Sequence, residues 1–449
     1  MADRERMKST MSEARRDGLL LLLLGSVIFV FLGFALQNVS STPLVDFRAM
    51  YYPARCLLQH CDPYNGDQVL RIYQAEGIYG PADTASVVLM ATRYLYLPGA
   101  FSVTLPFAML SWGLAHTLWI ALTVGSLIFG SLLIWRVGAN YRPIVAGCLI
   151  GFLLANSELL IDQGMCAGIA VSFCVIAVCC FVRHRFVVAG IVCLALSLAL
   201  KPQDTGLVWL YFLLAGGVYR RRGLQALLLT VVLSLPVVIW VSRVAPNWVQ
   251  ELHSNILSFS AHGGINDPGL ASSAGHGLAM VISLQSIISM FRDDPRVYNL
   301  GSYLVCAPLL LAWVFITLRF RTTPTRAWLA LAAIAALSML PVYHREYDAK
   351  LLLLTVPAGV MLWAEGGPIG KLALLLNTLG FVLTGDLTWA VLLGLINRLH
   401  PPATGLSHKI LIGLQVLPAP LILLLISVFY LWVYARECSH SVLEAKAGI

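Results

Sequence analysis

The run GLLLLLLGSVIFVFLGFAL at Gly18–Leu36 decides the fold class. Its length of about 19 apolar residues is sufficient to cross a bilayer as one helix. No small-residue cleavage site follows it, so we read it as a retained first span and not as a removed signal. Five basic residues precede the run, which predicts a cytoplasmic N-terminus and an outward-facing segment after Leu36. They are Arg4, Arg6, Lys8, Arg15 and Arg16.

The composition of the whole chain extends this interpretation. Of the 449 residues, 59% are hydrophobic and 12% are charged, and the mean hydropathy is +0.80. A soluble protein of this length does not need so much apolar surface, so the sequence predicts an all-α protein with many membrane spans. The net charge of +8 comes from basic residues in short loops between apolar runs. That pattern is typical of the positive-inside bias and argues against nucleic-acid binding.

A polar stretch follows the first span, VDFRAMYYPARCLLQHCDPY at Val45–Tyr64. Its apolar residues recur at the spacing of an amphipathic helix on the membrane surface. Asp46 falls at the expected start of this helix, where a carboxylate can simply cap free backbone amides. Cys56 and Cys61 lie in the same stretch, and we expect them to form a disulfide if the loop faces an oxidising compartment.

The residues of this stretch resemble glycosyltransferase family 87. The resemblance rests on DF-x-x-x-YY-x-A at Asp46–Ala54, on D-P-Y at Asp62–Tyr64 and on the Lys201 and Pro202 pair that closes an apolar run. It implies a GT-C fold and an inverting transfer from a polyprenyl-phosphate sugar, commonly mannose or arabinofuranose, to a lipid- or glycan-linked hydroxyl. Gln163 and Gly164 stand in the reverse of the order that is usual in the family.

Topology depends on whether Tyr94–Leu110 spans the membrane. Only if it lies in the outer interface do the basic clusters near residues 136–142, 183–185 and 220–222 share the cytoplasmic side with the N-terminus. Its two prolines and its short length also favour an interfacial element, which gives about twelve spans. The resulting segments are an N-terminus (1–17), a first helix (18–36), an outer loop (37–112), a transmembrane module (113–242), a second outer loop (243–301), C-terminal helices (302–435) and a cytoplasmic tail (436–449).

Ionisable residues are concentrated at the outer helix ends, and we expect one active site there. They are Asp46, Arg48, Arg93, Glu158, Asp162, Lys201, Asp204, His344, Arg345, Glu346 and Asp348. We predict Asp46 and His344 as catalytic residues, with Asp46 as the general base, and Arg93 and Lys201 as ligands of the donor phosphate. The expected substrate-binding residues are Tyr51, Tyr52, Glu158, Asp162, Gln163, Gln203, Arg345 and Glu346.

Simpler interpretations stand beside these roles. Lys201 can be a lysine that extends to the interface, Glu158 and Asp162 can belong to a plain turn, and His344 can be part of an interfacial anchor. No metal-ligand spacing occurs, so we expect neither a metal nor another cofactor.

The expected partners are the polyprenyl-phosphate sugar, the acceptor and membrane lipids, at the outer face of the cytoplasmic membrane. A flippase or transporter of a lipid-linked sugar is the alternative function. The scarcity of charges at mid-membrane depth argues against it, because alternating access needs a polar site there.

Overall fold

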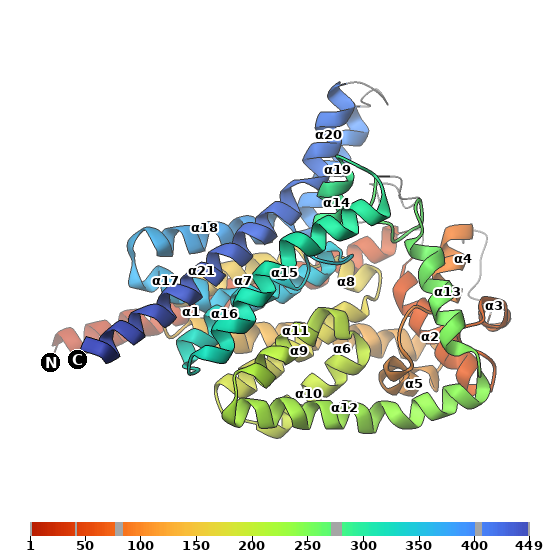
Figure 1. Cartoon of the computed structure of the whole chain (residues 1–449), viewed down its shortest axis with the longest axis horizontal. Helices are drawn as coiled ribbons and strands as arrows, with labels where there is room; N and C mark the ends of the chain where they lie inside the picture. The colour runs from red at the N-terminus through yellow and green to blue at the C-terminus, as the bar shows by residue number, and fades with distance from the viewer. Residues whose placement is uncertain (1, 41–42, 77–83, 271–280, 400–405, 448–449) are drawn as a thin grey trace.

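The computed structural model describes residues 2–40, 43–76, 84–270, 281–399 and 406–447. These residues form α-helices and two 3₁₀ helices, and the one β-bridge among them joins Val281 to Arg345. Figure 1 shows a bundle with both termini at one end and short helices gathered at the other. The prediction of an all-α membrane protein is confirmed.

Six helical segments are long and apolar enough to cross a membrane, within the part of the chain that the structure describes. They belong to α1 (Ala2–Val39), α6 (Trp112–Gly138), α12 (Gly217–Val244), α15 (Pro295–Arg319), η2 with α17 (Glu346–Leu354 and Thr355–Glu365) and α21 (Pro418–Ala447). A bent pair, α18 (Gly367–Leu383) and α19 (Asp386–Leu399), makes a seventh if its two halves form one span broken by 57°.

Shorter helices complete the bundle. The apolar ones are α7 (Pro143–Ala155), α9 (Cys166–Val182), α10 (Val187–Leu200) and α16 (Pro324–Leu337), and α11 (Pro202–Leu214) follows α10 directly. Every residue of α9 except Phe173 is buried, so this helix is surrounded by protein. Helices of this length cross a bilayer only where neighbouring helices cover their ends. The expected count of twelve spans therefore stays a prediction.

Helices α1 and α7 pack unusually closely through glycine. A Cβ atom at Gly147 would lie 2.0 Å from the carbonyl oxygen of Gly18, and one at Gly25 would lie 2.1 Å from that of Gly151. The obstacle in both cases is backbone, which cannot move aside without separating the helices. Small residues at such positions are what allow two helices to approach in a membrane.

We expect Gly151→Val to destabilise the protein by about 1–3 kcal/mol, because overpacking forces the two backbones apart. The melting temperature in detergent measures the effect. Gly125→Ala is the matched control, since a methyl group added at Gly125 of α6 would meet nothing within 4 Å. An unchanged melting temperature for Gly151→Val would show that α1 is not held by this contact.

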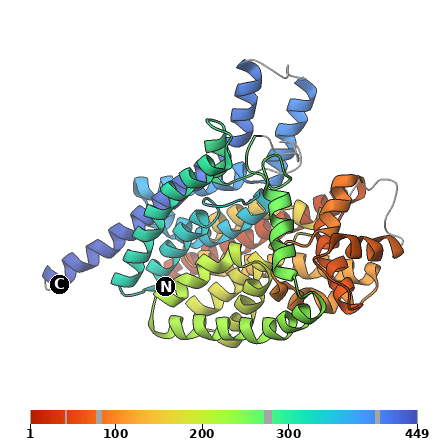
Figure 2. The ribbon, with the colours of Figure 1, turned by 45° about the vertical axis from the view of Figure 1, so that its right-hand side comes forward.

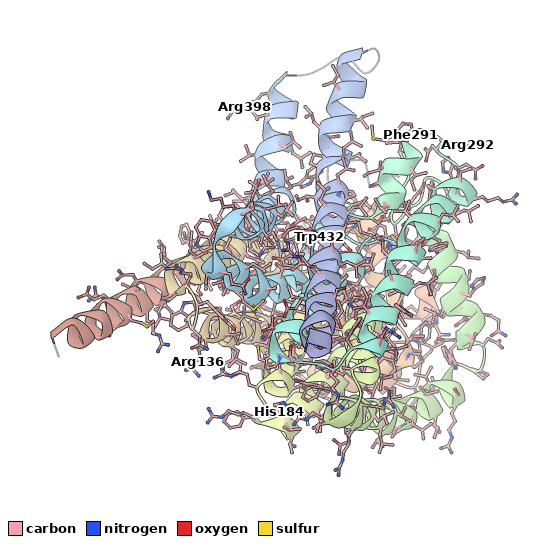
Figure 3. All side chains as sticks on the ribbon, turned by 60° about the vertical axis from the view of Figure 1, so that its left-hand side comes forward. Arg136, His184, Phe291, Arg292, Arg398 and Trp432 are labelled. Carbon is pink, nitrogen blue, oxygen red and sulfur yellow. A yellow bond between two sulfur atoms is a disulfide. The ribbon has the colours of Figure 1, made fainter. Side chains whose placement is uncertain are left out.

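The turn between α6 and α7 lies beside the N-terminal segment. Arg15 donates a hydrogen bond of 3.4 Å to Asn140, and the spanning part of α1 begins next to Pro143. Helix α6 therefore returns to the end of the bundle at which α1 begins. Figure 3 shows Arg136 and His184 at the end of the molecule opposite Arg292 and Arg398.

The segment Tyr94–Leu110 forms two short elements between α1 and α6, η1 (Pro98–Ala100) and α5 (Phe101–Ala108). Eight residues of α-helix cover only about 12 Å, which is too short to cross a bilayer. This arrangement favours the expectation that the segment does not cross.

Cysteine labelling tests that expectation. A single cysteine beside Gly138, in a chain without its native cysteines, should be protected from an impermeant reagent that is added outside the cell. A cysteine at Asp67, in the first outer loop, should react and is the matched control. Labelling at Gly138 from outside would reverse the predicted sidedness of every loop after it.

The outer end of the bundle is built from short helices. The first loop supplies α2 (Val45–Leu58), α3 (Gly66–Ala75) and α4 (Ala85–Thr92), and α8 (Leu159–Asp162) joins α7 to α9. The second loop contains α13 (Trp248–Ser260) and α14 (Leu284–Ser289), while its residues 271–280 lie outside the described ones. Helices α19 and α20 (Leu406–Val416) project from the top of the molecule in both ribbon views (Figures 1 and 2).

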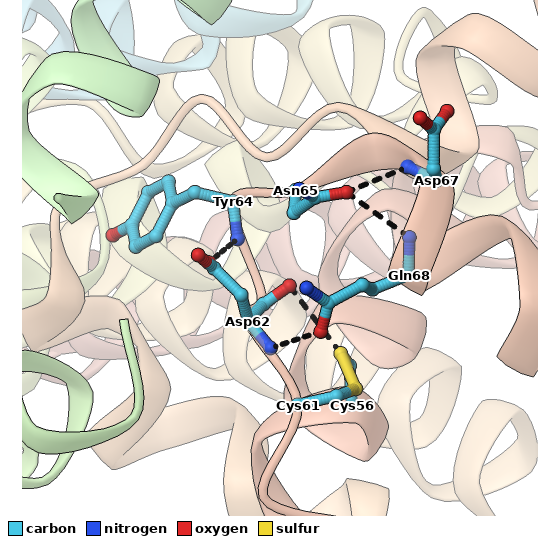
Figure 4. The surroundings of a disulfide bond; sticks show 7 residues. All are labelled: Cys56, Cys61, Asp62, Tyr64, Asn65, Asp67 and Gln68. Atoms are coloured by element: carbon cyan, nitrogen blue, oxygen red, sulfur yellow. Dashed lines mark hydrogen bonds between the residues drawn. A yellow bond between two sulfur atoms is a disulfide. The ribbon is translucent and has the colours of Figure 1, made fainter. Parts of the chain in front are cut away.

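A disulfide closes the end of α2. It joins Cys56 to Cys61, and the chain then turns at Asp62, whose carboxylate accepts a hydrogen bond from the amide of Tyr64 (Figure 4). Gln68 of α3 accepts a hydrogen bond of 2.9 Å from the amide of Asp62. The bridge and these bonds together fix the path between α2 and α3.

Candidate active site

A cavity of about 370 Å³ lies where the two outer loops meet the bundle. Its walls come from α2, α4, the segment before η1, the start of α9, the junction of α10 and α11, α13 and the segment before η2. Segments that are far apart in the sequence therefore line the same cavity. The predicted site residues that line it are Asp46, Arg93, Gln163, Lys201, Gln203, His344 and Arg345.

Backbone carbonyl groups hold the start of α2 in place. The carbonyl oxygen of Gln163 accepts hydrogen bonds from the amides of Asp46 and Phe47, at 3.1 and 3.3 Å, and that of Asp162 accepts from Leu44. Gly164 allows this approach, because its φ is +66° and a Cβ atom would meet Phe47 at 2.8 Å. The turn that contains Asp162 and Gln163 thus anchors the helix that carries Asp46.

Asp46 does not cap its helix. The N-cap position is Leu44, no side chain caps the helix, and the first amides are already paired with the turn. No described residue donates a hydrogen bond to the Asp46 carboxylate, which faces the cavity together with Val45 and Ala49. The carboxylate is therefore free to act on a bound molecule, and the capping interpretation loses its support.

The surroundings of Asp46 favour a base. Burial raises the pKa of this carboxyl to about 6, although the positive charges of Arg345 and Lys201 act in the opposite direction. A carboxylate with a pKa near the working pH accepts a proton better than an ordinary aspartate does and is still ionised at neutral pH.

Lys201 belongs to a buried cluster of charges at the cavity wall. Its ammonium group lies 3.0 Å from Asp204 and also donates a hydrogen bond to Asp348, which is 147 positions later in the chain. The other carboxylate oxygen of Asp204, Oδ1, lies 3.5 Å from Nε2 of His344. All four side chains are buried, so the simple interpretation of Lys201 as a lysine that extends into water does not fit.

The same cluster offers a possible set of metal ligands, Asp204, His344 and Asp348, whose ligand atoms lie within 4.8 Å of one another. However, the Lys201 ammonium already contacts both carboxylates. A divalent cation would have to displace it or share the space with a like charge. The residues thus fit a lysine-neutralised cluster better than a metal centre.

Two guanidinium groups face the cavity without a carboxylate partner among the described residues. Arg93 makes a hydrogen bond of 3.4 Å to Asn255, and Arg345 donates to the hydroxyl of Tyr343 and to the carbonyl oxygen of Ile265. Neither forms an ion pair within the described ranges, so both can receive an anion.

The two tyrosines predicted to bind substrate do not reach the cavity. Tyr51 and Tyr52 are buried beside α2, where Tyr52 stacks on Trp112 and packs against Tyr73, and the hydroxyl of Tyr51 donates to the carbonyl of Leu110. A helix turns by about 100° per residue, so Tyr51, five residues after Asp46, faces away from the cavity, whereas Tyr52 is kept out of it by these ring contacts. In this structure they hold α2 against the start of α6.

Glu158 and Glu346, also expected to bind substrate, lie in a second buried cluster. Its centre is an ion pair of 2.9 Å between Lys350 and Asp386, and Asp386 also accepts a hydrogen bond from the amide of Leu159. Burial followed by the charge of Asp386 raises the pKa of Glu158 to about 7. This cluster does not line the cavity, and neither does Asp162.

The prediction of the site left out residues that complete it. Asp204 and Asp348 bind Lys201, and Asn255 donates to the carbonyl oxygens of Tyr64 and Tyr94 while its own oxygen faces Arg93. Both acids appear in the sequence among the outer charged residues, so a signal was present for them. Nothing in the sequence marks Asn255.

Comparison with known proteins identifies the family of the chain. The sequence pattern of glycosyltransferase family 87 matches residues 94–342, which is more than half of the chain. The chain belongs to glycosyltransferase family 87. It is therefore a membrane glycosyltransferase. No curated protein and no solved structure gives a significant match.

The matched range contains Lys201 and Asp204 but neither Asp46 nor His344. The family match therefore covers the chain from the segment before η1 to the end of α16 and assigns no role to Asp46 or His344. The roles of Asp46 and His344 depend on their positions in the cavity.

Proposed function

We propose that this family 87 enzyme transfers a sugar, mannose or arabinofuranose, from a polyprenyl-phosphate donor to a lipid- or glycan-linked hydroxyl with inversion at the anomeric carbon. The reaction takes place at the outer face of the cytoplasmic membrane. The observation that carries the proposal is the cavity in which an unpaired carboxylate, Asp46, shares a space of about 370 Å³ with Arg93, Lys201 and Arg345. This volume is in the range of small-molecule sites.

Asp46 is the proposed general base. Inverting transfer needs one carboxylate that removes the proton of the acceptor hydroxyl while its oxygen attacks the anomeric carbon. The bond from that carbon to the phosphate oxygen breaks, and the electron pair leaves with the polyprenyl phosphate. A carboxylate without hydrogen-bond donors from the described residues is suited to receive this proton.

The cations are the proposed site for the phosphate. Negative charge increases on the phosphate as the sugar leaves, and fixed cations stabilise that charge more strongly in a closed cavity than in water. Lys201 and Arg93 were expected in this role. The structure supports adding Arg345, whose guanidinium faces the same cavity without an acid partner in the described chain.

A transfer assay tests the proposal. Purified protein should release polyprenyl phosphate from one member of a panel of polyprenyl-phosphate sugars when an acceptor is present, and the product should have inverted stereochemistry. The Asp46→Asn variant, purified and assayed in the same way, serves as the control. Movement of the donor across vesicle membranes without release of polyprenyl phosphate would favour the flippase alternative.

A further inference from the structure

The histidine of the cavity wall has an acceptor on each side of its ring. Nδ1 of His344 lies 3.0 Å from the carbonyl oxygen of Val342, and Nε2 lies 3.5 Å from Oδ1 of Asp204. A carbonyl oxygen and a carboxylate oxygen only accept hydrogen bonds, so each nitrogen is stabilised by carrying a proton. A ring with both nitrogens protonated is an imidazolium.

Because His344 is buried, its two ring nitrogens depend on these two acceptors. His344 and Asp204 are each 1% exposed, so water cannot replace a missing partner. A neutral ring would direct a lone pair from one nitrogen toward an acceptor oxygen. Burial by itself lowers the pKa of His344. The contact with Asp204 and the negative charges of Asp204 and Asp348 outweigh burial, so the pKa of His344 lies above its ordinary value.

The net charge of the cluster depends on whether His344 is neutral or protonated. Asp204 and Asp348 each contribute one negative charge, and Lys201 contributes one positive charge. With a neutral His344 the group is negative and repels a phosphate, whereas with an imidazolium it is neutral. Among the described residues, the charged groups that act on this histidine are these same three, and they come from α11, from the α10–α11 junction and from η2.

We propose that Asp204 is a positioning residue that holds His344 as an imidazolium and orients Lys201, so that the cavity wall presents both cations to the donor phosphate. This inference rests on the proposed function for the identity of the anion. It also assigns His344 the role of a cation and not of a second base. Asp204 touches no substrate in this scheme and acts through its two neighbours.

The protonation state can be measured without any activity. In protein labelled with ¹⁵N-histidine, the His344 signals, assigned by their loss in His344→Gln, should show two protonated ring nitrogens at pH 7.5. Asp204→Asn removes the negative partner and should lower the pKa of His344 by about one unit or more. A neutral His344 ring in the unmodified protein at this pH would overturn the inference, even if sugar transfer is fully confirmed.

The pH profile of transfer provides the second measurement. Because the active form of His344 is protonated, activity should be present below its pKa and lost as the pH rises through it. Asp204→Asn should therefore move the alkaline limb to lower pH and raise the KM for the donor. Asp386→Asn breaks a different buried ion pair and should leave that limb in place. An alkaline limb that does not move in Asp204→Asn would contradict the role of Asp204.

Discussion

Asp46→Asn should lower the rate of sugar transfer by about 10²–10⁴-fold, the usual contribution of a general base. Asparagine has nearly the same shape but cannot accept the proton. The variant should fold normally, because the amides at the start of α2 are paired with the turn at Asp162 and Gln163 and not with this carboxylate. Steady-state transfer and the melting temperature, measured on the same preparation, separate the two effects.

Asp67→Asn is a suitable control, since Asp67 is an exposed acid of α3 in the same outer loop. It should retain full activity. The unmodified enzyme should also lose activity below about pH 6, where Asp46 becomes protonated. If Asp46→Asn keeps a third of the normal turnover, the base is another group, and Asp204 and Asp348 are the remaining carboxylates of the cavity.

The sequence predicted the parts of the site that depend on helix ends. Asp46, Arg93, Lys201 and His344 were found because polar residues at the ends of apolar runs lie at the membrane surface, and the fold brings all four to one cavity. Periodicity also predicted α2. It could not show which face of α2 meets the cavity, because two apolar faces of a buried helix are equivalent in the sequence. The sequence therefore could not show that Tyr51 and Tyr52 do not line the cavity.

The sequence also could not predict which charged residues pair across long distances in the chain. The bond between Lys201 and Asp348 joins the end of α10 to η2, and the ion pair of Lys350 with Asp386 joins η2 to α19. Asp348 and Lys350 are next-but-one neighbours in the chain, yet they enter different clusters. Glu346 was predicted to bind substrate as one of the polar residues of the turn at 344–348, but η2 directs it to the second cluster, where it faces the charge of Asp386. Helix boundaries alone do not determine such partners.

Lys201→Met should reduce transfer about ten- to a hundredfold, which corresponds to the loss of a charge-assisted contact of about 1.5–3 kcal/mol. The structure adds a second effect. Removing the ammonium leaves Asp204 and Asp348 buried without their common cation. Breaking a buried pair in this way typically costs about 3–5 kcal/mol of stability. The single variant therefore cannot by itself distinguish a phosphate ligand from a structural counter-ion.

The double variant Lys201→Met with Asp348→Asn makes that distinction. It removes one negative charge together with the positive one, so the remaining Asp204 is balanced by His344 and most of the lost stability should return. Transfer should stay slow if Lys201 binds the donor phosphate, and the KM for the donor should stay high. Recovery of both stability and transfer would show that Lys201 only neutralises the two acids, and the phosphate would then be left to Arg93 and Arg345.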